Sequence, residues 1–158
     1  FEGPVYLRFG RPKVANFTTP ELGFEIGKGI LLNPGNDVTI VATGHLVWEA
    51  LQAAEELEAN GISAEVINIH TIKPLDEEII LNSVKKTGCL VSAEEHNYLG
   101  GLGETISGLL GLKLPTPMEM VATQDTFGES GTPAQLMTKY GLDKSAIIQK
   151  VHQVIKRK

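Results

Sequence analysis

Short apolar runs alternate with amphipathic segments along most of the 158 residues. The run VTIVAT shows no polar alternation, which is typical of a strand buried on both faces. Apolar residues spaced three and four apart between such runs predict helices. The expected strands are 4–9, 24–32, 37–43, 63–70, 89–95 and 117–122. The expected helices are 46–59, 76–86 and 103–110, then one from Thr132-Pro133 and one after Asp143.

Strands that alternate with helices predict an α/β fold. Right-handed crossovers then give a mostly parallel sheet with helices on both faces. The length fits one domain. Residues 12 to 22 are rich in turn-forming residues and are interpreted as a linker.

Composition narrows the function classes. A net charge of -5, from 14 basic and 19 acidic residues, argues against nucleic-acid binding, which requires clustered Lys and Arg. No apolar run approaches the roughly 20 residues that span a bilayer. The single cysteine, Cys89, allows no internal disulfide and suits a reducing compartment, so a cytoplasmic location is expected. The chain opens with Phe1 instead of Met and reads as a piece of a longer protein.

Three expected strands end in residues capable of acid–base or metal chemistry: His45, His70 and the stretch Glu94-Glu95-His96. Ligands of parallel sheets bind beyond the carboxyl ends of the strands. If the three strands are neighbours, these side chains share one edge, and a divalent metal site is one hypothesis. The alternative is a set of hydrogen-bonded histidines at the sheet edge.

The glycine cluster that follows Glu94-Glu95-His96 has two interpretations. Gly101 and Gly103 do not complete a G-x-G-x-x-G fingerprint, because residue 106 is isoleucine. Free N–H groups at the start of the next helix could still bind an anion. The alternative is that the glycines permit a sharp turn and close packing, and that Glu104 in the first helical turn would repel a phosphate.

Arg8 and Arg11 stand at the end of the first expected strand. Two arginines there could hold a substrate phosphate through bidentate hydrogen bonds, or be ordinary surface charges. Cys89 lies within an apolar strand and is interpreted as a core residue, not a nucleophile.

Five stretches, in sequence order, resemble the C-terminal end of transketolases. They are GPVYLRFGRP, DVTIVATGHLVWEALQAAEEL, INIHTIKPLD, SAEEHNYLGGLGE and DTFGESGTPAQLMTKYGL. The resemblance implies that residues 1–20 are the last strand of a pyrimidine-binding domain plus a linker. Residues 21–158 would then be the C-terminal domain, a three-layer α/β domain whose mostly parallel sheet has one antiparallel edge strand.

The resemblance also implies an activity for the parent protein. Transketolases transfer a two-carbon ketol unit from a ketose phosphate to an aldose phosphate, with thiamine diphosphate and Mg²⁺. The G-D-G…Asn metal motif and the glutamate that activates the cofactor do not occur in these residues. We therefore expect this piece to bind no cofactor, to be inactive alone, and to serve structure and assembly.

The expected partners are the remaining transketolase domains or a subunit, in a homodimeric parent. Arg8 matches the family's arginine for the sugar phosphate, and Arg11 is the second candidate. The family pattern gives no catalytic role to His96 and the acids beside it. That stretch is expected to form a strand-to-helix corner whose exposed acids serve packing or subunit contact.

The same order of domains occurs in 1-deoxyxylulose-phosphate synthases and in the beta subunits of 2-oxoacid dehydrogenases, which remain alternatives. A non-catalytic module for ligand binding or subunit assembly is an alternative of a different class.

Overall fold

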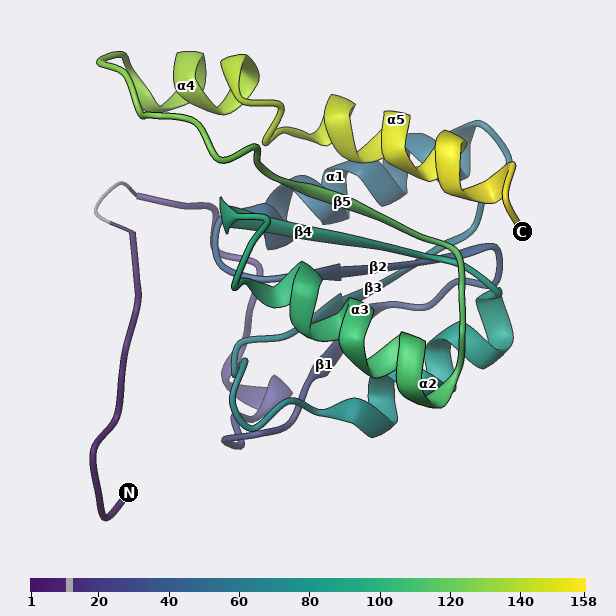
Figure 1. Ribbon diagram of the computed structural model, residues 1–158, viewed down its shortest axis with the longest axis horizontal. Helices are drawn as coiled ribbons and strands as arrows, with labels where there is room; N and C mark the ends of the chain where they lie inside the picture. Colours follow the sequence, from purple (N-terminus) through teal and green to yellow (C-terminus); the bar gives the residue numbers. More distant parts are fainter. Residues whose placement is uncertain (11–12) are drawn as a thin grey trace.

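The computed structural model describes residues 1–10 and 13–158 (Figure 1). Its strands are β1 (Ile30–Asn33), β2 (Val38–Ala42), β3 (Ala64–Asn68), β4 (Leu90–Asn97) and β5 (Met118–Thr123). Its helices are α1 (Leu46–Ala59), α2 (Glu77–Thr87), α3 (Leu102–Lys113), α4 (Pro133–Lys139) and α5 (Lys144–Ile155), with a 3₁₀ turn, η1, at Pro20–Leu22.

The strands form one sheet in the order β1-β3-β2-β4-β5. β1 pairs with β3 in the antiparallel direction, and the other three pairings are parallel. Helices α1 and α5 cover one face, and α2 and α3 cover the other (Figure 1). The expected three-layer α/β fold with one antiparallel edge strand is confirmed.

Every residue of the central strands β2 and β3 is buried, which explains their unbroken apolar runs. Successive side chains of β2 face opposite layers. Ile40 packs in the cluster beneath α1 and α5, and Val41 packs in the cluster beneath α2 and α3.

The helix boundaries follow from local capping. The side chain of Asp76 accepts a hydrogen bond from the Ile79 amide at the start of α2, and Gly88 closes that helix in the left-handed conformation. Asp143 accepts from the Ala146 amide at the start of α5. The expected capping box at Thr132 is present before α4.

Two strand expectations are wrong. Residues 4–9 form no strand in this chain, because nothing in the described residues lies beside them to supply ladder hydrogen bonds. The strand expected from residue 24 begins only at Ile30, because a turn with Gly27 at a φ of 86° precedes it. The assignment of residues 1–20 to another domain stays a prediction.

Within the described residues, no helix is long and apolar enough to cross a membrane.

Candidate functional site at the carboxyl edge of the sheet

β2, β3 and β4 point the same way, so the residues after them meet at one side of the molecule, on the left in Figure 1. We call this side the carboxyl edge. His45 follows β2 and His70 follows β3. Glu95 and His96 are close to the C-terminal end of β4. The extended N-terminal residues 1–10, here called the arm, run along the same side.

His45 and Glu95 form an ion pair across the ends of neighbouring strands. His45 Nδ1 lies 2.8 Å from Glu95 Oε2, and the two side chains are 22% and 42% exposed. Arg8 joins them, because its Nη2 donates to the Glu95 carbonyl oxygen at 2.8 Å. Gly10 passes so close to the His45 ring that a Cβ there would collide with it. The arm is thus held to the carboxyl edge by backbone and side-chain contacts.

The three histidines do not converge on one point. His70 Nδ1 hydrogen-bonds Thr71 Oγ1 at 2.9 Å, and its ring stacks at 4.4 Å from that of Phe24. Burial lowers the pKa of His70. His96 is exposed and donates from Nδ1 to the Asn97 carbonyl. Over residues 1–10 and 13–158, no three His, Cys, Asp or Glu side chains are placed to hold a metal ion together.

The carboxylate of Glu94 occupies the N-terminus of α3. It is 1% exposed and accepts hydrogen bonds from the amides of Leu102 and Gly103, both at 2.8 Å. The first N–H groups of a helix normally lack a partner and attract anions. Here the chain's own carboxylate accepts hydrogen bonds from two of these groups, so the place that a phosphate would take is already occupied. The expectation that the acids of this stretch are exposed is wrong for Glu94.

The glycines of this corner serve close packing. A Cβ at Gly101 would collide with the Glu94 carboxylate, and one at Gly103 would lie 2.9 Å from Met120 Sδ and from Ser92 Oγ. The stretch is therefore a strand-to-helix corner, as the second interpretation of the glycines predicts.

Cys89 is fully buried, and burial raises the pKa of its thiol. A buried thiol with a raised pKa is a poor nucleophile, in keeping with its interpretation as a core residue.

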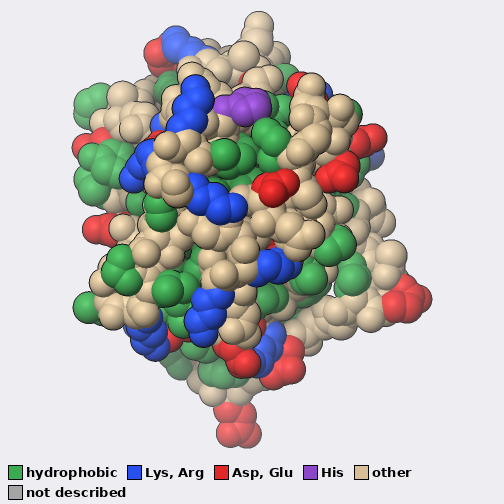
Figure 2. Space-filling model, turned by 90° about the vertical axis from the view of Figure 1, so that its right-hand side faces the viewer, with side chains coloured by type: hydrophobic (Ala, Val, Ile, Leu, Met, Phe, Trp, Pro, Cys, Tyr) green, Lys and Arg blue, Asp and Glu red, His purple; other side chains and the backbone are tan. Residues whose placement is uncertain are grey.

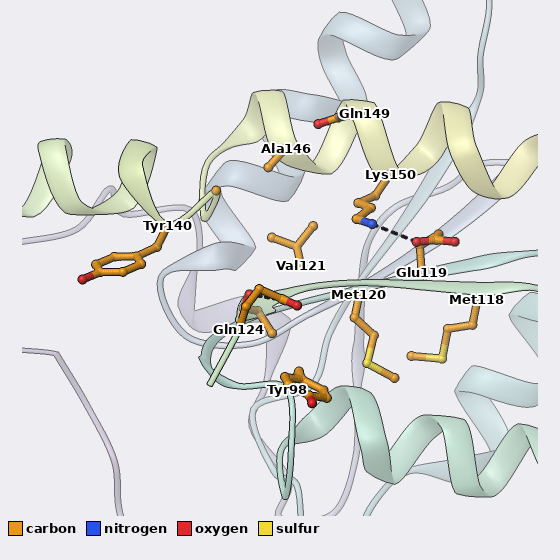
Figure 3. A pocket seen from close by; sticks show the side chains of 12 residues that line it. Tyr98, Met118, Glu119, Met120, Val121, Gln124, Tyr140, Ala146, Gln149 and Lys150 are labelled. Atoms are coloured by element: carbon orange, nitrogen blue, oxygen red, sulfur yellow. Dashed lines mark hydrogen bonds and ion pairs between the residues drawn. The ribbon is translucent and has the colours of Figure 1, made fainter. Parts of the chain in front are cut away.

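Sequence reasoning missed an open cavity of about 510 Å³ along the outer side of β5, beneath α5 (Figure 3). Its two charged lining residues are paired, since Lys150 Nζ lies 2.9 Å from Glu119 Oε2. Arg157 pairs with the same carboxylate. Burial, the largest contribution, raises the pKa of Glu119, but the hydrogen bonds and charges of the two cations outweigh it and leave the pKa below its usual value.

Of the two arginines expected to bind phosphate, the structure describes only Arg8. Arg8 lies on the exposed arm, bound to Glu95 as described. Arg11 lies outside the described residues. A phosphate-binding role stays a prediction for both.

Three comparisons relate the chain to known proteins. Residues 27–147 match the model of the transketolase C-terminal domain family. A 6-deoxy-6-sulfo-D-fructose transketolase subunit of Clostridium sp. strain MSTE9 is 46% identical over 157 residues, which are 99% of this chain and 49% of that protein. A putative transketolase C-terminal section of Methanocaldococcus jannaschii is 40% identical over 160 residues, covering 99% of this chain and 50% of that protein.

A solved structure has nearly the same fold. It is a split-gene transketolase described as an inactive beta4 tetramer, with a TM-score of 0.95 and 43% identity. The match covers 99% of this chain and 51% of that one. The chain thus spans about half the length of these three relatives.

Proposed function

This chain belongs to the transketolase family, as its C-terminal domain, and on that premise we propose that its parent protein transfers a two-carbon ketol unit from a ketose phosphate to an aldose phosphate. The observation that carries the proposal is the 46% identity along 99% of the chain to a subunit named for sugar ketol transfer. The parent is further proposed to be a homodimer located in the cytoplasm, with the remaining transketolase domains or a separate subunit as partners.

The terminal group of the sugar is the part that this chain is proposed to contact. The named substrate of the Clostridium subunit carries a sulfo group, whereas ketose phosphates carry a phosphate. Both are tetrahedral oxyanions that a guanidinium group can bind with two parallel hydrogen bonds. A sulfosugar is therefore a second substrate to test.

Arg8 is the described residue best placed to bind such an oxyanion. A guanidinium has five N–H donors, and the Glu95 carbonyl takes one of them. The remaining donors are available to an anion, because Arg8 is exposed. Arg11 is the second candidate, from the sequence alone.

Thiamine diphosphate and Mg²⁺ would supply the carbanion chemistry of ketol transfer in the parent. The described residues of this chain do not fit that group. The one helix N-terminus at the glycine corner is filled by Glu94, and no acid–histidine cluster of three members is present in residues 1–10 and 13–158. The cofactor is therefore proposed to lie in the rest of the parent, and this domain to serve structure and assembly.

The parent protein is the material for the test. It is supplied with xylulose 5-phosphate, ribose 5-phosphate, thiamine diphosphate and magnesium, and release of glyceraldehyde 3-phosphate is followed. We expect turnover, and 6-deoxy-6-sulfofructose as donor tests the sulfosugar. Turnover that requires pyruvate in place of the ketose phosphate, with an aldose phosphate or an acyl acceptor as second substrate, would favour the 1-deoxyxylulose-phosphate synthase or 2-oxoacid dehydrogenase alternatives and contradict ketol transfer.

The alternative function, a non-catalytic module for ligand binding or subunit assembly, predicts a different result. A nucleotide or a metal ion would then bind the 158-residue chain tightly, and titration calorimetry would show it. We expect no heat of binding.

A further inference from the structure

The guanidinium group of Arg8 has two anions within its reach. The first is the terminal oxyanion of the sugar, which Arg8 is proposed to bind. The second is the carboxylate of Glu95, because Arg8 Nη2 already donates to the backbone carbonyl oxygen of that same residue at 2.8 Å. A guanidinium binds a carboxylate more strongly than a neutral carbonyl, so an unrestrained Glu95 side chain would compete with the substrate for Arg8.

His45 engages that carboxylate from the neighbouring strand end. Its Nδ1 lies 2.8 Å from Glu95 Oε2, and His45 is the less exposed partner, at 22% against 42%. An Nδ1–H group donates to the carboxylate both in the neutral tautomer that carries it and in the protonated ring. The pair therefore directs the charge of Glu95 toward the loop after β2 and away from the arm.

The His45 ring is itself held in place. It follows β2 as the residue before α1, and the backbone of Gly10 passes so close to its Nε2 and Cε1 atoms that no Cβ would fit between them. Gly10 stands only two residues after Arg8 on the arm. The same packing thus fixes the imidazole that holds Glu95 and the segment that carries Arg8.

We propose that His45 is a positioning residue for the sugar's terminal oxyanion: by binding the Glu95 carboxylate, it keeps the guanidinium of Arg8 free for that group. The inference deepens the proposed function and rests on it, because Arg8 has this role only in a parent that acts on such a sugar. Loss of His45 should weaken the binding of donors with a terminal phosphate or sulfo group and leave uncharged donors unaffected.

The test uses the parent protein with His45→Phe, which keeps a ring beside Gly10 but removes the N–H donor, and with the double variant His45→Phe/Glu95→Gln. We expect His45→Phe to raise the KM for xylulose 5-phosphate about threefold or more, with a smaller change in kcat, because the released carboxylate pairs with Arg8. The double variant should restore the KM, since glutamine carries no charge. The KM for erythrulose, a ketose without a terminal anion, should not change in either variant.

Two results would overturn the proposal. The first is an unchanged KM for xylulose 5-phosphate in His45→Phe. The second is a raised KM that the added Glu95→Gln does not restore, because His45 would then act only by packing against the arm. The same two variants built on His45→Ala cover the case in which the larger phenyl ring displaces Gly10.

His152 provides a matched control. It is an exposed histidine in the last turn of α5, and that end of α5 lies on the side of the molecule opposite the carboxyl edge (Figure 1). Charged side chains of both signs, together with hydrophobic ones, lie on that side (Figure 2). His152→Phe therefore makes the same substitution on a mixed surface far from Arg8, and it should leave the KM for xylulose 5-phosphate unchanged. An increase equal to that of His45→Phe would contradict a specific role for His45.

Chemical modification of Arg8 separates this inference from the proposed function. Phenylglyoxal reacts with guanidinium groups, and the rate is read without any sugar for the peptide that carries Arg8. We expect His45→Phe to slow this reaction about threefold or more, and the double variant to restore it. That pattern in a parent without ketol transfer keeps the positioning role of His45 and removes the function. Ketol transfer with equal modification rates and equal KM values in all variants keeps the function and removes the positioning role.

Discussion

The carboxylate of Glu94 lies against the α-carbon of Gly101, in the space that a side chain at residue 101 would otherwise take. Only glycine allows the chain to pass this close to a buried carboxylate. The two residues are seven positions apart: Glu94 lies within β4, and Gly101 is the N-cap residue of α3.

We expect Gly101→Ala to destabilise the fold by about 2 kcal/mol, because the added methyl group must push the carboxylate off the α3 amides or displace the helix. Urea unfolding of the chain measures the difference. Gly108→Ala is the matched control, since it lies on the exposed side of the same helix with no atom within 4 Å of the new Cβ. It should stabilise by up to about 1 kcal/mol, and equal effects at the two glycines would contradict the packing argument.

Glu94→Gln should destabilise the fold by about 2–3 kcal/mol. The amide keeps one acceptor oxygen but turns an NH₂ group toward a backbone N–H, and the charge-assisted bonds to Leu102 and Gly103 are lost. Glu104→Gln is the control, because Glu104 is an exposed acid of the same helix that accepts from the Gly100 amide. Its cost should stay within about 0.5 kcal/mol. Similar midpoints of urea unfolding for both variants would show that burial of Glu94 matters little.

The ion pairs of Glu119 predict a pH dependence. Its pKa in the folded chain lies below the usual 4.5, so the carboxylate stabilises the fold above pH 4.5, and that stability is lost as the pH falls through the lowered value. Glu119→Gln should therefore cost about 1 kcal/mol near neutral pH, and the difference from the unaltered chain should shrink below pH 4.5.

Urea unfolding at several pH values measures this difference. The control is Glu129→Gln, which breaks the exposed pair of Glu129 with Lys139 and should leave the unfolding midpoint almost unchanged at any pH, because water screens the pair. A Glu119 effect that does not change with pH would mean that packing, and not charge, causes it.

Arg8→Ala in the parent protein should raise the apparent KM for a phosphorylated ketose by about 10–100-fold, with a smaller change in kcat, because a charged hydrogen bond to the oxyanion is lost. A ketose without a terminal anion should show no change in KM. Lys13→Ala is the control, because Lys13 is an exposed cation only five positions further along the chain. A fall in kcat with an unchanged KM would instead give Arg8 only the role of holding the arm to Glu95.

The spacing of apolar residues and the capping residues were sufficient to predict most of the helices from the sequence. The face shared by Val47, Leu51, Ala54 and Leu57, followed by Gly61, predicts α1 at its observed bounds. The capping residues Asp76 and Asp143 do the same for the starts of α2 and α5. These signals act within a few residues of the chain, so they do not depend on the tertiary structure.

The two acids Glu94 and Glu95 show what pattern alone does not reveal. They are adjacent and chemically alike, but neighbouring residues of a strand point to opposite sides. Glu94 turns toward the start of α3, and Glu95 turns toward His45 on the neighbouring strand's loop. Which acid is buried depends on the path of the chain several residues later and on the order of the strands, and neither follows from the local sequence.

The strand expected at 4–9 fails for a related reason. Its apolar pattern is genuine, but a strand requires a partner for its N–H and C=O groups, and the described residues of this chain do not supply one.

The occupied N-terminus of α3 has a consequence if the parent protein acts on phosphorylated sugars, as proposed above. In an α/β domain whose helix N-terminus has free N–H groups, that N-terminus could bind phosphate esters and compete with the reaction centre for them. Because Glu94 is covalently part of the chain, its local concentration exceeds that of any dissolved anion, and its displacement would leave a buried charge without partners. Because Glu94 already accepts the hydrogen bonds of the Leu102 and Gly103 amides, this helix N-terminus would not draw phosphorylated substrate away from the reaction centre of the proposed parent enzyme.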